Sequence, residues 1–197
     1  MDQLTQNIIQ TSLTKFMQFG IRSISIDDIC NDLRISKKTF YQIFPKKEDL
    51  VEAVLQYQTS TTGEKFQKLT KNKNAIDVVV LIIREVRSNS HEDLSVFHYD
   101  LAKYYPSISN KYQEIKTEAI RASFEENLRQ GIAEGYYRED LDIELGAMFH
   151  AVLLRNFQNT MELYPKVGHK RILNFYIDVI VRLITNEKGL KYIESIS

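Results

Sequence analysis

The sequence has few of the residues that tight turns require, with only 7 glycines and 3 prolines among 197 residues. Sandwiches and barrels join many short strands through such turns, so this scarcity favours long helices. The single cysteine, Cys30, excludes an internal disulfide and fits a reducing compartment. No apolar run is long enough to span a bilayer, and the opening MDQLTQNIIQ lacks the apolar segment of a secretory signal. We therefore expect an all-α, cytoplasmic protein with no membrane partner.

The sequence also has no excess charge of either sign, with 26 Lys and Arg against 26 Asp and Glu. Its basic residues are nevertheless unevenly placed. The stretch ISKKTFYQIFPKKEDL contains four lysines, two phenylalanines and a tyrosine, and its first acid is Glu48. In a helix, Phe40 and Phe44 share one face, because residues four apart lie on the same side. The phenylalanines would dock this helix, while its basic and amide residues face solvent.

Capping residues divide the N-terminal region into short helices. We expect a first helix at Thr5–Phe19, a second at Ile26–Leu33 after the N-cap Ser25, and a third at Lys37–Phe44 after the N-cap Ser36. Arg34-Ile35 forms the tight turn between the second and third. Two short helices joined by such a turn, the second with an outward basic face, form a helix-turn-helix that fits the DNA major groove.

A basic run alone is more often a solvated surface, and two phenylalanines at this spacing are more often only core. The ordered combination of two serine caps, the short turn and the Phe-Pro stop is more specific. Lysine donates to guanine O6 and N7, and glutamine pairs with adenine. Lysines near a helix N-terminus can also bind phosphate.

These motifs resemble the DNA-binding domain of the TetR family of bacterial transcriptional regulators. The similarity runs from Ile8 to Leu50 and includes FMQFG at the end of the first helix, Asp28-Ile29-Cys30 in the second, ISKKTFYQIF in the third and KEDL after it. It implies a DNA-binding domain over residues 1–46 and a helical effector-binding and dimerisation domain over residues 47–197. The DNA-contacting residues it implies are Ser25, Ser36, Lys37, Lys38, Thr39, Tyr41, Gln42, Lys46 and Lys47. Three positions depart from the family pattern: Arg34 replaces a common turn glycine, Lys38 replaces a small residue, and Cys30 replaces a small apolar residue.

The remaining chain also has helical periodicity. We expect helices at Ala75–Ser88, Glu92–Tyr104, Asn110–Gly131, Ile143–Leu163 and Lys170–Asn186. The last two are apolar on more than one face, so each must bury two sides. One side would face a second copy of the chain, although a helix central to a monomeric core is the alternative. The candidate interface residues are Met148, Val152, Phe175, Val179, Ile180 and Leu183.

Aromatic residues after Leu50 supply candidates for an effector site, because rings with a hydroxyl suit an apolar or aromatic ligand. Any single ring is more often simply core. The candidates are His98, Tyr99, Tyr104, Tyr105, Tyr112, His150 and Phe157. A further stretch, Thr59–Gly63, contains poor helix formers and predicts either a hinge within a fourth helix or the end of a shorter one.

The sequence contains no zinc-ligand spacing, phosphate-binding glycine loop or nucleophile motif. We therefore expect no enzyme activity, metal or cofactor. The favoured function is a ligand-responsive transcriptional regulator, a repressor that binds a palindromic double-stranded DNA operator as a homodimer. The alternative is a helical ligand-binding or protein-interaction protein whose helix-turn-helix has degenerated.

Overall fold

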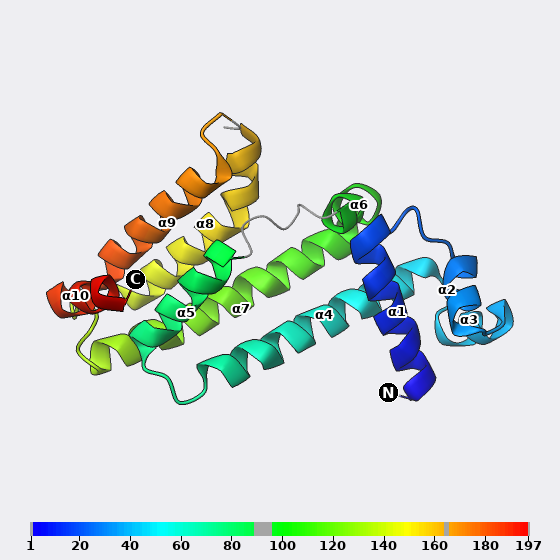
Figure 1. The fold of residues 1–197 in the computed structure, drawn as a ribbon, viewed down its shortest axis with the longest axis horizontal. Coiled ribbons are helices and arrows are strands. Elements are labelled where there is room, and N and C mark those ends of the chain that lie inside the picture. The colour runs from blue at the N-terminus through cyan, green and yellow to red at the C-terminus, as the bar shows by residue number, and fades with distance from the viewer. Residues whose placement is uncertain (1, 89–95, 164–165, 197) are drawn as a thin grey trace. The chain divides into compact units, whose positions relative to one another are not determined.

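The structure, a computed structural model, describes residues 2–88, 96–163 and 166–196, which form ten helices and no strand (Figure 1). This confirms the predicted all-α class. The helices are α1 Gln3–Phe19, α2 Ile26–Leu33, α3 Lys37–Ile43, α4 Lys47–Thr70, α5 Ala75–Ser88, α6 Val96–Tyr104, α7 Pro106–Ala133, α8 Ile143–Leu163, α9 His169–Ile184 and α10 Glu187–Ile196.

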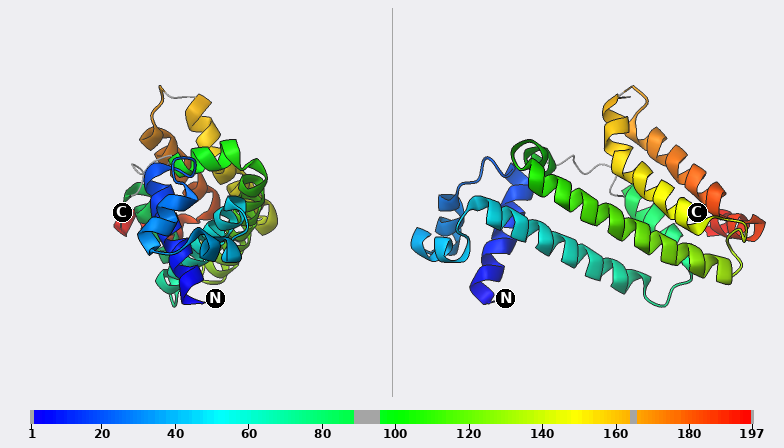
Figure 2. Two further views of the ribbon diagram at one scale, coloured as in Figure 1. Left: turned by 90° about the vertical axis from the view of Figure 1, so that its right-hand side faces the viewer. Right: turned by 180° about the vertical axis from the view of Figure 1, so that it is seen from behind.

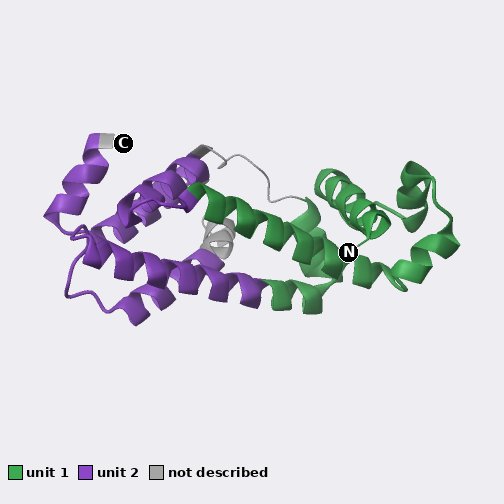
Figure 3. Cartoon of the chain, turned by 90° about the horizontal axis from the view of Figure 1, so that it is seen from below, with its two compact units in different colours: residues 1–69, 92–112 green, residues 70–91, 113–197 purple. Residues whose placement is uncertain are grey.

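The chain divides into two compact units (Figure 3). Unit 1 contains residues 1–69 and 92–112, and unit 2 contains residues 70–91 and 113–197. Helices α1 to α3, almost all of α4, and α6 therefore belong to unit 1. Helix α7 begins in unit 1 and continues into unit 2.

One apolar core holds unit 1 together. Helices α2 and α3 lie beside α1 and the first turns of α4 in both sets of views (Figures 1 and 2). The fully buried side chains of this core include Phe16 of α1, Ile29 of α2 and Phe40 of α3. The same core takes Leu50 from α4 and Phe97 from α6. Burial of each such side chain contributes roughly 1.5–3 kcal/mol, so helices α1 to α3 depend on α4 and α6 for their position.

Unit 2 has its own core, formed by α5, the second part of α7, and α8 to α10. A buried polar chain crosses it. The Tyr137 hydroxyl donates to the Asn127 side-chain oxygen at 2.9 Å, and the Asn127 amide donates to the Ala75 carbonyl at 2.9 Å. Burying polar groups is costly unless they are hydrogen-bonded, so these paired groups fix α7 against the start of α5.

Several predicted helix ends differ from the structure: α1 begins at Gln3, not Thr5, and α3 ends at Ile43, not Phe44. Helix α7 begins at Pro106, ahead of the predicted start at Asn110, because proline has no N–H to lose at the first helical position. The last predicted helix ends at Ile184, and a tenth helix, α10, follows it. The Asn186 side chain accepts the Gly189 N–H at 3.0 Å, which caps this new helix. A side chain on Gly189 would meet the Tyr136 carbonyl, so glycine allows α10 to pack closely.

Helix α4 continues without interruption through Thr59–Gly63 to Thr70. The reading of this stretch as the end of a shorter helix was therefore wrong. The Thr59 hydroxyl donates to the Leu55 carbonyl at 2.7 Å, one turn earlier. Space around Gly63 is open, so packing does not require glycine there. The stretch keeps its weak helix propensity inside a continuous helix, and its role as a hinge stays a prediction.

The turn between α2 and α3 has a left-handed residue, Arg34, with φ 52° and ψ 41°. We expect Arg34→Gly to raise the free energy of unfolding by roughly 0.5–1 kcal/mol, because glycine adopts this conformation without steric strain. Urea unfolding measures the change. Asn72→Gly is the control: Asn72 has φ 60°, but asparagine tolerates this region better, so its gain should be smaller. A loss of stability in Arg34→Gly would contradict the expectation.

Candidate nucleic-acid interface

Helix α2 begins at a reciprocal cap. The Ser25 hydroxyl oxygen accepts the Asp28 N–H at 3.2 Å, and the Asp28 carboxylate accepts the Ser25 N–H at 2.8 Å. The Ser25 hydroxyl also donates to the same carboxylate at 2.6 Å. These bonds hold the pKa of Asp28 below its ordinary value. Ser25 is thus engaged within the domain, and a phosphate would have to compete with Asp28 for its proton.

Helix α3 begins at a second serine cap. The Ser36 hydroxyl oxygen accepts the Thr39 N–H at 3.0 Å, and the Ser36 and Thr39 hydroxyls are 2.8 Å apart. Phe40 and Phe44 are buried beneath the helix, and the Tyr41 ring packs edge-on against Phe40. Tyr41 itself remains 47% exposed. The predicted inward and outward faces of this helix are therefore present.

The predicted DNA-contacting lysines and the turn residue Arg34 fall into three groups. Arg34, Lys38 and Lys46 are exposed and form no ion pair with any residue that the structure describes. Lys37 pairs with Asp27 of α2 at 2.8 Å. Lys47 is turned inward. Gln42 is exposed on the same face as Lys38.

Lys47 connects the start of α4 to the loop between α1 and α2. Its ammonium donates to the Ile21 carbonyl at 2.6 Å and to the Ile24 carbonyl at 2.5 Å. Burial lowers the pKa of Lys47. Because an ammonium has three protons, one donor remains for a phosphate. Sequence analysis missed the internal role, since nothing in the pattern gives the direction of this side chain.

The single cysteine lies within the same helical framework. Cys30 of α2 is 4% exposed, and burial raises the pKa of its thiol. A buried thiol with a raised pKa is a poor nucleophile and a poor metal ligand. Cys30 therefore serves the core beneath the helix-turn-helix.

The sequence pattern of the bacterial regulatory proteins of the tetR family matches residues 8–54, which span most of α1, all of α2 and α3, and the start of α4. Over these residues the chain is similar to the tetR family. It is 25% identical over 142 residues to the HTH-type transcriptional repressor KstR2 of Mycolicibacterium smegmatis, covering 70% of this chain and 69% of that protein.

Solved structures support the fold over almost the whole chain. The reduced form of E. coli NemR has a TM-score of 0.72 at 12% identity, covering 93% of this chain and 98% of NemR. A transcriptional regulator from Cytophaga hutchinsonii has a TM-score of 0.71 at 16% identity, covering 94% and 100%. At such identities the likeness concerns the fold alone.

Helix α6 holds the loop after α1. The buried Asp100 carboxylate accepts the Arg22 N–H at 2.8 Å. Gly20, with φ 82°, leaves the space that Asp100 and Val96 occupy beside the backbone. The Arg22 guanidinium donates to the Tyr104 hydroxyl at 2.6 Å. The loop that leads into α2 is thus held by Lys47 and by Asp100.

The predicted effector residues of unit 1 have different surroundings. Tyr99 is exposed and bonds Lys103, and Tyr104 bonds Arg22. Tyr105 and Tyr112 instead pack against the core of unit 1, where burial raises the pKa of each. The half-buried His98 ring lies edge-on to Phe97.

Unit 2 contains the other two candidates. The His150 ring stacks on Phe124 with centroids 3.9 Å apart, and its Nδ1 lies 2.7 Å from the Tyr176 hydroxyl. Burial lowers the pKa of His150 to about 4, so the ring is neutral at pH 7. Phe157 belongs to α8, but its side chain lies outside the described residues.

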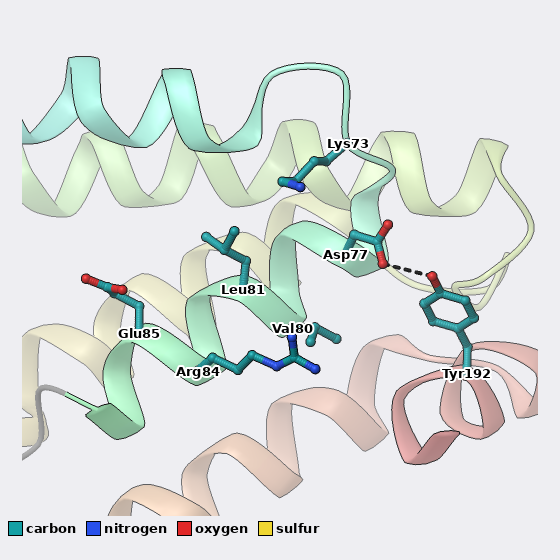
Figure 4. Close-up of a pocket in the computed structure, with 7 residues that line it drawn as sticks. All are labelled: Lys73, Asp77, Val80, Leu81, Arg84, Glu85 and Tyr192. Carbon is teal, nitrogen blue, oxygen red and sulfur yellow. Dashed lines mark hydrogen bonds between the residues drawn. The ribbon is translucent and has the colours of Figure 1, made fainter. Parts of the chain in front are cut away.

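A hollow of about 500 Å³ opens elsewhere in unit 2, between α5 and α10 (Figure 4). The Tyr192 hydroxyl donates to Asp77 at 2.9 Å at one end of it. Its lining residues are Lys73, Asp77, Val80, Leu81, Arg84, Glu85 and Tyr192. None of these lining residues was among the predicted effector residues, because α10 was not predicted and the candidates were chosen mainly for their aromatic rings.

The described residues contain no cluster of three or more His, Cys, Asp or Glu placed to hold a metal ion. No described helix is long and apolar enough to cross a membrane.

An apolar stripe is exposed on α8 and α9. Its members are Leu145 (55% exposed), Met148 (49%), Phe149 (48%), Val152 (48%) and Phe175 (71%). Val179 and Leu183 are half-buried on α9. Ile180 is only 6% exposed and packs within its own unit, so its place among the candidate interface residues was wrong.

We expect Lys47→Met to lower the free energy of unfolding by roughly 1–3 kcal/mol, because it leaves the Ile21 and Ile24 carbonyls without their donor while keeping an apolar stem. The matched control is Lys46→Met at the adjacent, exposed position, where a change within about 0.5 kcal/mol is expected. Equilibrium unfolding in urea measures both. Equal stability of the two variants would show that Lys47 has no structural role.

Proposed function

We propose that this chain is a ligand-responsive TetR-family repressor that binds a palindromic operator as a homodimer. One observation carries the proposal: a doubly capped helix-turn-helix presents Lys37, Lys38, Tyr41 and Gln42 on the outward face of α3. This arrangement suits direct readout in a major groove. In this proposal residues 1–46 bind DNA, and residues 47–197 bind the effector and dimerise.

Each exposed group on this face has a matching feature of DNA. Gln42 can pair with the N6 and N7 edge of adenine, and Lys38 can donate to guanine O6 and N7. Arg34 and Lys46 flank α3 and suit phosphates, as does the remaining proton of Lys47. The hydroxyls of Ser25, Ser36, Thr39 and Tyr41 are placed for further phosphate contacts if their internal bonds rearrange.

The rival function, a degenerate helix-turn-helix that no longer reads DNA, drew support from the missing turn glycine. Arg34 adopts the left-handed conformation that glycine commonly supplies. The connection between α2 and α3 therefore retains its tight geometry, which favours the DNA-binding function over the rival.

The exposed stripe on α8 and α9 supports the dimer. Large apolar side chains in a contiguous exposed group are typical of interaction surfaces. Phe175 is 71% exposed, which is costly for a phenylalanine that has no partner. A two-fold interface would cover the same stripe on both copies. We assign Met148, Val152, Phe175, Val179 and Leu183 to this interface.

For the effector, we propose a mostly apolar or aromatic molecule bound in unit 2, beside the Phe124, His150 and Tyr176 rings. A neutral His150 and a tyrosine hydroxyl supply a few polar handles among stacked rings. Titrating aromatic compounds against operator-bound protein tests this: compounds that change operator affinity in the parent should lose that effect in His150→Ala.

The DNA-binding function is tested by selecting genomic fragments that bind the purified protein. A footprint should show two half-sites whose centres lie roughly 34–36 Å apart. We expect Gln42→Ala to cost ~1–3 kcal/mol on the selected operator and to relax the base preference at one position in each half-site. Gln56→Ala, at an exposed position of α4, should leave affinity unchanged. Unchanged binding by Gln42→Ala would remove α3 from the groove.

The dimer is tested by sedimentation. We expect Phe175→Glu to convert a dimer into a monomer at micromolar concentration, since it buries two charges at a two-fold contact. Phe19→Glu is the matched control, because Phe19 is also exposed (49%) but lies on α1. If both variants sediment like the parent, the stripe on α8 and α9 is not the interface.

A further inference from the structure

One acid reaches the face that we propose contacts DNA. Asp27, the second residue of α2, places its Oδ1 atom 2.8 Å from the ammonium of Lys37, the first residue of α3. Both side chains remain accessible, at 54% for Asp27 and 62% for Lys37. The hydrogen bond to Asp27, together with its charge, raises the pKa of Lys37. The pair joins the two helices of the helix-turn-helix on its solvent side.

The other aspartates of this region contact other groups. Asp28 caps α2, Asp49 accepts the Lys46 N–H at 2.9 Å, and Asp32 pairs with Lys15 of α1 at 2.7 Å. Among the residues that the structure describes, Asp27 is thus the one acid shown in an ion pair with a cation of the α3 face.

An exposed ion pair contributes little to stability, so it can be exchanged for another anion. Non-specific DNA binding depends on how many phosphates the cations neutralise, each adding about 0.9 to the slope of log affinity against log salt. A lysine already bound to a carboxylate does not add to that number. A carboxylate at the surface also repels phosphate.

We propose that Asp27 is a specificity-determining residue, which holds Lys37 away from the phosphates of non-operator DNA and yields it only when α3 is seated in the operator groove. The inference rests on the proposed DNA-binding function. On non-operator DNA, α3 lacks matching bases and the Asp27–Lys37 pair stays closed. On the operator, base contacts from the rest of α3 bring Lys37 to a phosphate that displaces Asp27.

The proposal predicts a change confined to non-operator DNA. In Asp27→Asn, Lys37 is free to bind one more phosphate on any duplex. The salt slope on a non-operator duplex should steepen by about 0.9, which at 0.1 M salt corresponds to roughly eightfold tighter binding relative to a 1 M reference. On the selected operator, Lys37 has already left Asp27, so the slope should stay the same. The ratio of operator to non-operator affinity therefore falls.

The matched control is Asp32→Asn. Asp32 is on the same helix, has similar exposure (48%), and is paired with a lysine outside the α3 face. Its loss changes the net charge equally, but screening over about 8–10 Å at ordinary salt limits its effect on the groove. It should change the slopes on both duplexes little.

The experiment measures fluorescence anisotropy of a scrambled duplex and of the selected operator between 0.05 and 0.3 M salt. It uses full-length parent, Asp27→Asn, Asp32→Asn, Lys37→Gln and the Asp27→Asn/Lys37→Gln double variant. In the Lys37→Gln background, Asp27→Asn should no longer steepen the non-operator slope. Lys37→Gln alone should lower the operator slope by about 0.9 and leave the non-operator slope unchanged.

The proposal is overturned if Asp27→Asn and Asp32→Asn have equal salt slopes on non-operator DNA. It is also overturned if Asp27→Asn steepens the salt slope equally on both duplexes. A third contradicting result is that Asp27→Asn still steepens the non-operator slope in the Lys37→Gln background. If Asp27→Asn does not fold, Lys37→Gln tests the same ion pair by removing its α3 member. A lower non-operator salt slope in Lys37→Gln would show that Lys37 binds non-operator phosphate in the parent, so the pair is not closed there. Failure of the parent to bind any duplex with salt dependence overturns the proposed function instead.

Discussion

The contact on which the DNA-binding unit depends is the ammonium of Lys47 between two backbone carbonyls, those of Ile21 and Ile24. The loop after α1 must turn sharply while its apolar residues stay in the core, so its carbonyls cannot all reach water. A cation on the first turn of α4 satisfies two of them. From the other side, Asp100 of α6 satisfies the Arg22 N–H of the same loop. The entry to α2 is thus fixed by charged groups whose partners are backbone atoms.

This arrangement explains why the two short helices α2 and α3 can hold a stable geometry. Helices of seven or eight residues are marginal in isolation, and most of their stability must come from tertiary packing. Ser25 and Ser36 set where the two helices begin, and Phe40 fixes α3 to the core. The outer face of α3 stays exposed, with Lys38 and Gln42 accessible to a partner and Lys37 paired with Asp27.

The helix-turn-helix could be predicted from the sequence because the patterns that indicate it involve residues close together in the chain. A serine cap depends on a residue two or three positions away, and inward packing of Phe40 follows from helical spacing. The left-handed turn at Arg34 could be suspected only from the comparison with the family pattern. The Asp27–Lys37 pair and the inward turn of Lys47 could not be foreseen, because both depend on how separate helices are placed in space.

Sequence reasoning was weaker in the larger part of the chain for a related reason. Aromatic residues form cores and line ligand sites alike, so their presence does not separate the two roles. Tyr105 and Tyr112 proved to be core, whereas Tyr99 and Tyr104 hold cations at the surface. Helix α10 was missed because the apolar pattern of α9 ends directly before Asn186, the residue that caps the start of α10. Ile180 has the right spacing for an exposed stripe but turns into its own unit.

The burial of Cys30 has a practical consequence. Because the native thiol is hidden within α2 and its pKa is raised, alkylating reagents at neutral pH react with it slowly. A cysteine introduced on the outer face of α3 would then be labelled selectively, with no native residue to remove first. Spin labels at that position in two associated copies would report the separation of the recognition helices in solution, with and without a bound small molecule.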